Sequence, residues 1–454
     1  MSEANKMRCY VCDRVGDWLR PTVQIEGKTV PIHAEMTTQI CRNCGNACHD
    51  VDVSKEAEIK EFYRTSYRPQ PTTVNLITTT HKQNYIRTFL KDFLQEASKN
   101  NKQLLVGDVG AATGYLCNFF RGLGHKATGC ELTRTYRRMS EHYYGIPLTE
   151  ELEPKHKYDL ITIYHVLEHM MEPDKKLAHY ASLLAEGGHM LIATPFWFST
   201  LEEASGSQVQ SFENLFHKNH INLFSKVSLQ NLFRKSGLTI VKEDFDQYGQ
   251  TYLIKKSASP VHPDWMTKED AHEVERIMLV QKKAIDLYNA GKFREAYEAF
   301  PDFPDAWIGH IFHRCAKDLA KQMDVMSEAD KFIGHSYRYK LAKSQWLYQQ
   351  GRLAEAIQGF QDYISLKPNE DTFVYLGYSL AQAGKTKEAI QALQIACSMD
   401  PRKWQEAQTW ILAQCCQLPT WDERAMIEAQ QAFLIKQKPE AQPEAHGEIR
   451  SLTK

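Results

Sequence analysis

The pattern of apolar and polar positions divides the chain into regions of different texture. From residue 61 to 256, short apolar runs alternate with amphipathic stretches, which is typical of the strands and helices of an α/β layer fold. From residue 268 to 437, apolar positions recur at helical spacing throughout. Residues 1–60 carry short strand-like runs and little helical periodicity. The pattern therefore predicts three folded regions, with residues 257–267 as a linker and residues 438–454 as a polar tail.

The C-terminal region contains a repeat of glycine, small alanine, large apolar residue and proline. Its copies are Gly351, Ala356, Phe360 and Pro368; Gly384, Ala389, Leu393 and Pro401; and, in part, Gly291, Ala296 and Phe300. Glycine permits a tight turn, and a small side chain lets two helices approach each other closely. The period of 33 residues resembles the tetratricopeptide repeat. The resemblance implies an all-α solenoid, which we expect to bind a protein partner or a second copy of the chain.

Five of the 11 cysteines fall within the first fifty residues. Four of them form two Cys-x-x-Cys pairs, Cys9 with Cys12 and Cys41 with Cys44. Each pair can direct two thiolates at one ion, and four thiolates complete the tetrahedral shell that Zn²⁺ prefers. We therefore expect a structural zinc, because a closed shell leaves no position for water. A redox dithiol and plainly buried cysteines are the alternatives, with Cys48 and His49 as substitute ligands.

Charge and hydropathy narrow the class of protein. The 55 Lys and Arg residues nearly balance 56 Asp and Glu residues, which argues against a protein that coats nucleic acid. No stretch approaches the roughly 18 apolar residues of a membrane-spanning helix, and the N-terminus lacks an apolar signal core. We expect a cytoplasmic protein that binds neither membrane nor nucleic acid.

A small-residue turn carries the clearest chemical signal. A short apolar strand leads into the pattern Asp108-x-Gly110-x-Ala112-x-Gly114, which opens a helix. Small residues let a ligand approach the backbone, and the helix N-terminus offers free N–H groups. A second strand ends at Glu131, an acid able to accept hydrogen bonds from both ribose hydroxyls. A nucleotide-like cofactor is therefore predicted, although the Gly-x-Gly-x-x-Gly turn of a dehydrogenase fits poorly.

These residues resemble the first motif of the class I S-adenosylmethionine-dependent methyltransferases, Asp/Glu-x-Gly-x-Gly-x-Gly, with Ala112 at the middle glycine. Further segments match in the expected order: 158–164, then His165-Val-Leu-Glu168-His169, then 184–195, 238–245 and 251–255. The resemblance covers about 180 residues and implies a Rossmann-like domain with a seven-stranded sheet. It implies that S-adenosylmethionine binds at Asp108, Gly110, Ala112, Gly114, Glu131 and His165.

The acceptor is expected at the carboxyl ends of the strands, where ligands of open α/β sheets bind. Residues 216–225 resemble a Tyr-x-Glu-His stretch of sugar-nucleotide C-methyltransferases, which also begin with a Cys-rich module. Only His220 matches, since His217 and Asn219 replace Tyr and Glu, so O-methylation is equally open. As general base we place His220 first, His217 second and His165 third. The alternative is that these histidines fix loops through hydrogen bonds.

Together these features predict a methyltransferase of a small polar acceptor, a sugar or sugar nucleotide of glycan or natural-product biosynthesis. The rivals are a protein methyltransferase, whose repeats would hold a polypeptide, and a non-catalytic interaction protein. Phe196, Trp197 and Phe198 either line the acceptor pocket or pack as a lid. Tyr164 and His165 stand where DNA adenine methyltransferases carry Pro-Pro, which argues against that activity.

Overall fold

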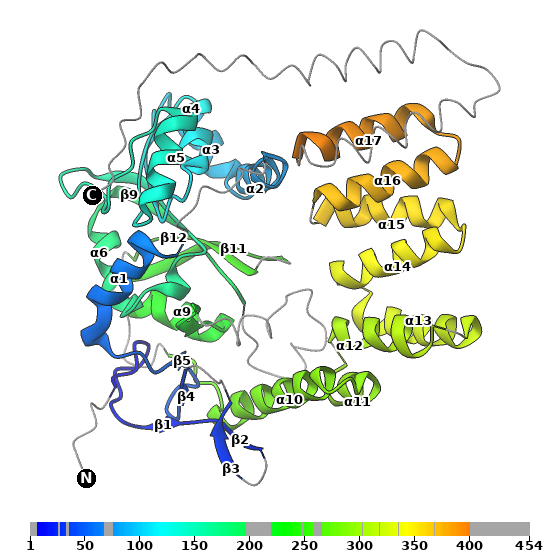
Figure 1. The fold of residues 1–454 in the computed structure, drawn as a ribbon. Helices are drawn as coiled ribbons and strands as arrows, with labels where there is room; N and C mark the ends of the chain where they lie inside the picture. Colours follow the sequence, from blue (N-terminus) through cyan, green and yellow to red (C-terminus); the bar gives the residue numbers. More distant parts are fainter. Residues whose placement is uncertain are drawn as a thin grey trace, which may run out of the picture. The chain divides into compact units, whose positions relative to one another are not determined.

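The computed structural model falls into two compact units, each described here by itself (Figure 1). The first comprises residues 1–343 and 365–367, and the second residues 344–364 and 368–454. The structure describes residues 7–25, 28–32, 36–67, 76–196, 219–246, 249–257, 266–301, 303–316, 318–334, 336–366 and 368–399. His217, Trp197, Phe198, Pro401 and the predicted tail, 438–454, lie outside the described residues.

A six-stranded sheet forms the centre of the first unit. Its strands, in spatial order, are β11 (Leu238–Asp246), β12 (Gly249–Lys256), β9 (Leu184–Thr194), β8 (Tyr158–Tyr164), β6 (Leu105–Val109) and β7 (Lys126–Cys130). The last four run parallel, whereas β12 is antiparallel to β9 and β11 is antiparallel to β12. This mixed sheet confirms the expected Rossmann-like α/β fold.

The described residues give this sheet six strands, one fewer than the seven expected. At the β7 edge, a single parallel bridge joins Cys130 to Thr149. Pro147 lies two residues before Thr149, and proline has no N–H to donate to a ladder. The chain therefore reaches the position of a further strand but pairs there over one bridge only.

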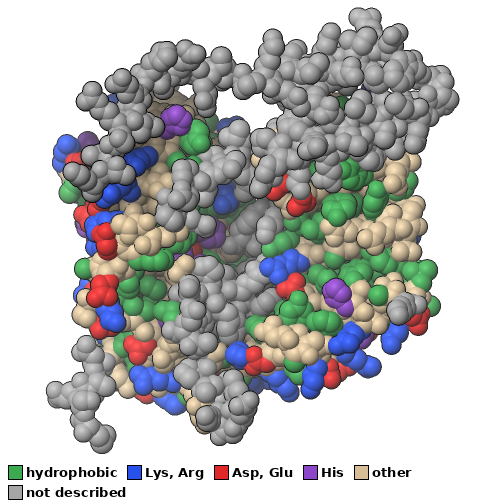
Figure 2. Space-filling model, in the orientation of Figure 1, with side chains coloured by type: hydrophobic (Ala, Val, Ile, Leu, Met, Phe, Trp, Pro, Cys, Tyr) green, Lys and Arg blue, Asp and Glu red, His purple; other side chains and the backbone are tan. Residues whose placement is uncertain are grey.

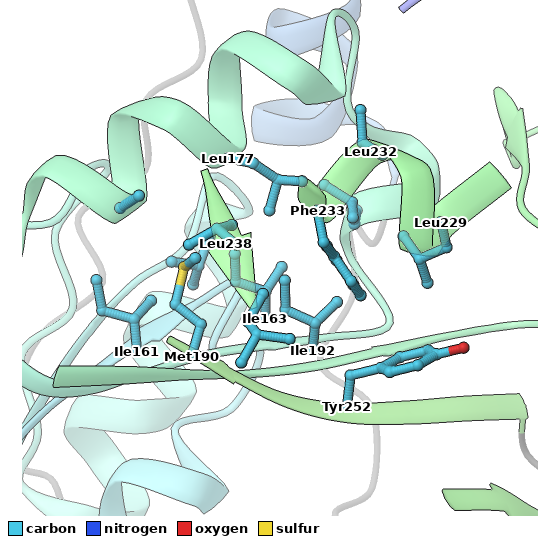
Figure 3. Packing of buried hydrophobic residues seen from close by; sticks show 14 of the residues in the cluster. Ile161, Ile163, Leu177, Met190, Ile192, Leu229, Leu232, Phe233, Leu238 and Tyr252 are labelled. Carbon is cyan, nitrogen blue, oxygen red and sulfur yellow. The ribbon is translucent and has the colours of Figure 1, made fainter. Parts of the chain in front are cut away.

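Helices cover both faces of the sheet (Figure 1). They are α2 (Leu76–Phe89), α3 (Lys91–Lys99), α4 (Tyr115–Gly122) and α5 (Arg134–Tyr144) on one side, and α6 (Pro173–Ser182) and α9 (Lys226–Lys235) on the other. Alternate strand residues serve the two cores, since side chains of a strand point to opposite faces. Leu160 packs in the core with α4, whereas Ile161 packs in the core with α6 and α9. Figure 3 shows this second core, where Phe233 and Leu177 meet the strand side chains.

A smaller four-stranded sheet joins the N-terminal region to the segment that follows β9 of the large sheet. Its strands, in order, are β1 (Trp18–Leu19), β4 (Thr38–Cys41), β5 (Ala47–His49) and β10 (Asn222–Leu223). β10 belongs to the segment after β9, and Asn222 pairs with Cys48 across the sheet. A separate hairpin consists of β2 (Thr22–Ile25) and β3 (Lys28–Pro31). The cysteine region is therefore built into the methyltransferase-like body through β10.

The described chain after the large sheet is helical from Ala271 to Met399, as predicted, and residues 400–437 of the predicted repeats lie outside the described residues. Its helices are α10 (Ala271–Asn289), α11 (Phe293–Ala299), α12 (Pro304–Gly309), a π-helix (His310–Arg314), α13 (Leu319–Ile333), α14 (Tyr337–Gln349), α15 (Leu353–Leu366), α16 (Glu370–Gln382) and α17 (Thr386–Met399). α10 packs its Val274 and Ile277 against Leu19, Ile40 and Leu223 of the small sheet. The first of these helices is thus part of the first unit's core.

The repeat residues occupy equivalent local positions. Gly291, Gly351 and Gly384 follow the ends of α10, α14 and α16 with φ of 71°, 72° and 77°, the left-handed conformation that ends many helices. Ala356 and Ala389 are buried at 0% and 1% exposure, which fits close helix pairing. The helical C-terminal region is confirmed, and the tetratricopeptide class stays a prediction.

The surface agrees with the balanced charge of the sequence. On the face shown in Figure 2, Lys and Arg side chains are interspersed with Asp and Glu side chains. Such mixing leaves no wide field of one sign on that face. Within the described residues, no helix combines the length and the apolar character that a membrane span requires.

Candidate functional site

A cavity of about 390 Å³ opens at the carboxyl ends of β6, β7 and β8. Each strand contributes the residues that follow it to the wall: Gly110 and Ala112 after β6, Glu131 and Thr133 after β7, and His165 after β8. The helix α1 (Glu56–Thr65) closes another side. The volume lies in the range of small-molecule sites, and the strand ends are where such sheets bind ligands.

The turn after β6 needs its glycines for two reasons. Gly110 and Gly114 have φ of 66° and 78°, a conformation that side chains with a Cβ rarely adopt. A Cβ would also collide with the Val166 side chain at Gly110 and with the Ser140 hydroxyl at Gly114. Ala112 adopts φ of 47°, so the position that carries glycine in the family motif requires the same conformation here. An alanine in this region is strained by roughly 1–2 kcal/mol.

Glu131 fastens this turn to the next one. Its Oε2 accepts a hydrogen bond from the Ala112 N–H at 2.9 Å, and its Oε1 accepts one from the Thr133 N–H at 2.7 Å. Because a carboxylate offers about four lone-pair sites, Glu131 can accept further hydrogen bonds from a ligand in the cavity. The structure therefore places this predicted residue where ribose hydroxyls could reach it.

Asp108 lies beneath the turn and is absent from the cavity wall. Its side chain is buried, and the Thr162 hydroxyl donates a hydrogen bond to its Oδ1 at 2.5 Å. Burial raises the pKa of Asp108 to about 7, against the lowering effect of the Thr162 hydrogen bond. Gly114 is also outside the wall. These two residues can support the turn, whereas Gly110, Ala112 and Glu131 can touch a ligand.

A glutamate and three histidines meet beside the cavity. The short 3₁₀ helix η2 (Leu167–His169) brings Glu168 Oε1 within 3.6 Å of His165 Nδ1 and 3.8 Å of His169 Nε2. The ring of His220 lies 4.9 Å from the ring of His169. Burial alone would raise the pKa of Glu168, but interaction with His165 and the nearby histidine charges hold that pKa below its ordinary value.

The predicted bases differ in access to the cavity. His165 and His169 belong to the wall, whereas His220, whose ring lies 4.9 Å from that of His169, is not among the residues that line the cavity. His165 has φ of 56°, a strained conformation for a residue with a Cβ, of the kind that often occurs at functional sites. Phe196 is buried and packs edge-to-face on Phe245, so it belongs to the core rather than to the wall.

Asn222 holds these loops together, a role that the sequence did not reveal. Its Nδ2 donates to Met170 O at 2.8 Å and lies 3.4 Å from the carbonyl oxygens of Leu167 and Glu168. Its backbone pairs with Cys48 in the small sheet. The turn carrying Glu168 and the segment carrying His220 are therefore fixed to each other.

Sequence reasoning also missed the wall residues in the region before β6, among them Tyr63, Tyr67 and Lys82. Tyr63 belongs to α1 and Tyr67 lies two residues beyond its end, with their ring centroids 4.9 Å apart. Lys82 of α2 lines the cavity, and burial lowers the pKa of its ammonium group. Two tyrosines within five positions were the available signal for the aromatic pair, and Tyr67 lies past the end of α1.

The four predicted cysteines lie together in the structure. Cys9 Sγ is 3.7 Å from Cys44 Sγ, and Cys12 Sγ is 3.5 Å from Cys41 Sγ. All four sulfur atoms lie within 4.8 Å of one another. Two thiolates bound at about 2.3 Å to a tetrahedral zinc are about 3.8 Å apart, whereas a disulfide bond is about 2.05 Å long. The donor set therefore fits a four-thiolate zinc site.

Comparison with known proteins supports a methyltransferase domain. Residues 47–243 match a family model described as a methyltransferase domain. The ubiquinone biosynthesis O-methyltransferase of Rhodopseudomonas palustris (strain BisB18) is 28% identical over 155 residues, which are 30% of this chain and 61% of that protein. The protein of the same name from Bartonella quintana (strain Toulouse) is 23% identical over 197 residues, 40% of this chain and 74% of that protein.

Solved structures of methyltransferases also align with part of the chain. The magnesium protoporphyrin IX methyltransferase of Synechocystis PCC 6803 with bound SAH is 14% identical, covers 44% of this chain and 97% of its own, and has a TM-score of 0.32. Mitomycin 7-O-methyltransferase is 16% identical, covers 34% of this chain and 49% of its own, and has a TM-score of 0.30.

Proposed function

Residues 47–243 form a methyltransferase domain, and from this premise we propose that the protein is an S-adenosylmethionine-dependent O-methyltransferase of a small polar acceptor. The observation that carries the proposal is the cavity at the ends of β6, β7 and β8, walled by the motif residues Gly110, Ala112 and Glu131. The curated relatives that match the chain carry the name O-methyltransferase, which favours oxygen as the accepting atom.

S-adenosylmethionine fits the chemistry of this wall. Its two ribose hydroxyls can donate hydrogen bonds to the Glu131 carboxylate. Its amino-acid end can approach the backbone at Gly110 and Ala112, where side chains are small. Lys82 offers a positive charge to the cofactor's carboxylate, because a buried ammonium group gains most from an anionic partner. Asp108 and Gly114 support the turn from below.

In methyl transfer, the bonds that form and break belong to the two reactants, and the protein forms no covalent bond. The acceptor oxygen attacks the methyl carbon, the carbon–sulfur bond breaks, and its electron pair stays on the sulfur as a neutral thioether. The enzyme must align the two reactants and receive the hydroxyl proton. We propose that His165 is the base that receives this proton, because it belongs to the cavity wall and its Nδ1 lies 3.6 Å from Glu168 Oε1. His220, whose ring lies 4.9 Å from that of His169, we propose as a residue that positions His169.

For the acceptor we propose a sugar or a sugar nucleotide. The wall combines hydroxyl, imidazole and carboxylate groups, among them Tyr63, His169 and Glu150, which can hydrogen-bond several hydroxyls. A phenol is the second candidate, favoured by the neighbouring rings of Tyr63 and Tyr67 and by the name of the matching relatives. Aromatic rings prefer such neighbours at 4.5–7 Å.

We further propose a structural zinc at Cys9, Cys12, Cys41 and Cys44. The sulfur spacing supports it, and the Asn46 side-chain amide lies 3.9 Å from Cys9 Sγ, where it can donate to a thiolate. The helical repeats, of which α16 and α17 form one pair, we propose as a surface for protein docking or self-association.

A transfer assay tests this function. Full-length protein is incubated with methyl-labelled S-adenosylmethionine and, separately, sugar nucleotides, phenols, peptides and a small-molecule cell extract. We expect label in a small hydroxylated compound, and His165→Ala should lower kcat by about 10²- to 10⁴-fold. His179→Ala, on the exposed side of α6, is the matched control. Label found only in polypeptide would overturn the acceptor assignment.

A further inference from the structure

Glu168, His169 and His220 form a compact group of metal-binding side chains outside the cysteine cluster. One ligand atom from each lies within 4.8 Å of the other two. The first two residues come from η2 after β8, and the third from the segment before β10. Two imidazoles and one carboxylate are a recurrent ligand set for divalent transition metals.

The hydrogen bond of His169 prepares its other nitrogen for a cation. Its Nδ1 lies 2.6 Å from the backbone oxygen of Asn219, and a carbonyl oxygen can only accept, so Nδ1 is the donor. In the neutral ring, Nε2 then carries the free electron pair. This nitrogen lies 3.8 Å from Glu168 Oε1. A metal ion between these two electron-pair donors would bind both of them.

The carboxylate of Glu168 also favours a bound cation. The residue is 1% exposed, and its Oε2 has no hydrogen-bond partner among the described residues. A buried carboxylate oxygen left without a donor is costly, and coordination to a cation removes that cost. Asn222 meanwhile binds the carbonyl oxygens of the η2 turn, so the carboxylate is held in place from the backbone.

We propose that Glu168, His169 and His220 bind a divalent cation beside the cavity, with zinc the best chemical match. Ligands at about 2.1 Å from a tetrahedral ion are about 3.4 Å apart, so the ligand atoms close the group when they approach one another by up to about 1.4 Å. Three protein ligands leave one position open, as in catalytic zinc sites. His169 belongs to the cavity wall, so the proposed ion would lie next to the cavity.

The role of this ion rests on the proposed methyl transfer. A cation that binds the acceptor hydroxyl lowers its pKa and favours the alkoxide that attacks the methyl group. The hydroxyl proton passes to His165, the new carbon–oxygen bond forms, and the carbon–sulfur electron pair leaves with the sulfur. The ion keeps its oxidation state, so no oxidant or reductant is needed.

Counting zinc in the full-length protein tests the site without any substrate. After equilibration with zinc and removal of loosely bound metal, elemental analysis should find about two zinc ions per chain, one in each cluster. His169→Ala/His220→Ala and the isosteric Glu168→Gln should each hold about one. His142→Ala and His179→Ala change exposed histidines and should hold two. Circular dichroism and thermal unfolding identify any variant that fails to fold.

The outcomes separate the metal site from the reaction. One zinc per wild-type chain, lost only in Cys41→Ser, would overturn the site while leaving methyl transfer open. Two zinc ions retained by Glu168→Gln and by the double histidine variant would overturn this ligand set. Cobalt should add, in the wild type and in the two control variants but not in Glu168→Gln or the double histidine variant, a bound ion that lacks thiolate charge-transfer absorption. A wild type with two ions and no methyl transfer would refute the proposed reaction and keep the site.

Discussion

At the scale of single residues, Asp108 is a motif position whose side chain lies outside the cavity wall. Its carboxyl group is buried below the turn and accepts a hydrogen bond from Thr162. The sequence pattern correctly places Asp108 in the strand that leads into the turn, β6. The burial of its side chain depends on the neighbouring strand β8, which no local sequence pattern reports. Glu131, after the next strand, is the predicted cofactor-binding acid that lines the cavity.

Asp108→Asn should change the pH dependence of stability. The folded-state pKa of about 7 exceeds the unfolded value of about 3.9, so between these values the folded state keeps a proton that the unfolded state has lost. Stability from this group therefore falls as pH rises through that window. The variant should gain on the order of 3 kcal/mol over wild type between pH 4.5 and 8, measured by urea unfolding.

Asp92→Asn, which changes an exposed residue of α3, serves as the control and should follow wild type at each pH. A stability difference between Asp108→Asn and wild type that stays constant with pH would contradict the raised pKa.

At the scale of elements, the short strand β10 connects two parts that the sequence separates. Local patterning foresaw strands near 22–32, 104–109, 158–164 and 238–255, because their apolar runs are long enough to be recognised. β10 has two residues, and its partner β5 lies more than 170 positions earlier. A pairing of this kind depends on the tertiary fold and leaves no periodic signal. The cysteine module and the histidine segment therefore looked independent in the sequence.

Asn222→Ala should loosen this connection. It removes the donor to the Met170 carbonyl, and the loss of one buried hydrogen bond costs about 1–3 kcal/mol of unfolding free energy. We expect kcat for methyl transfer to fall at least tenfold while KM for S-adenosylmethionine changes little, since the Glu131 end is untouched. Steady-state kinetics and thermal unfolding of the full chain measure both effects.

Asn118→Ala, on the exposed surface of α4, is the control for this substitution. Loss of stability in Asn222→Ala with an unchanged kcat would assign Asn222 a purely structural role. Partial recovery of kcat in Asn222→Gln, which restores an amide donor, would support the positioning role.

At the scale of the whole molecule, the methyltransferase domain is the part that sequence and comparison describe together. The motif from Asp108 to Gly114 predicted it, and the family match over residues 47–243 confirms it. The helical C-terminal region is confirmed as helical, while the class of its repeats and its partners stay predictions. The sugar acceptor was inferred from the resemblance of residues 216–225, in which only His220 matches, and from the Cys-rich module; His220 is not among the residues that line the cavity. Acceptor identity depends on cavity shape, which the sequence pattern does not encode.

Binding of S-adenosylmethionine is the measurement that tests this account most directly. Isothermal titration of the full-length protein should show one cofactor per chain. Glu131→Gln should weaken binding by roughly 10- to 100-fold, the size expected for lost hydrogen bonds to a charged group, and the exposed Glu141→Gln should bind as wild type does. Absence of binding by the folded wild type, or equal affinity in Glu131→Gln, would contradict the proposed cofactor site.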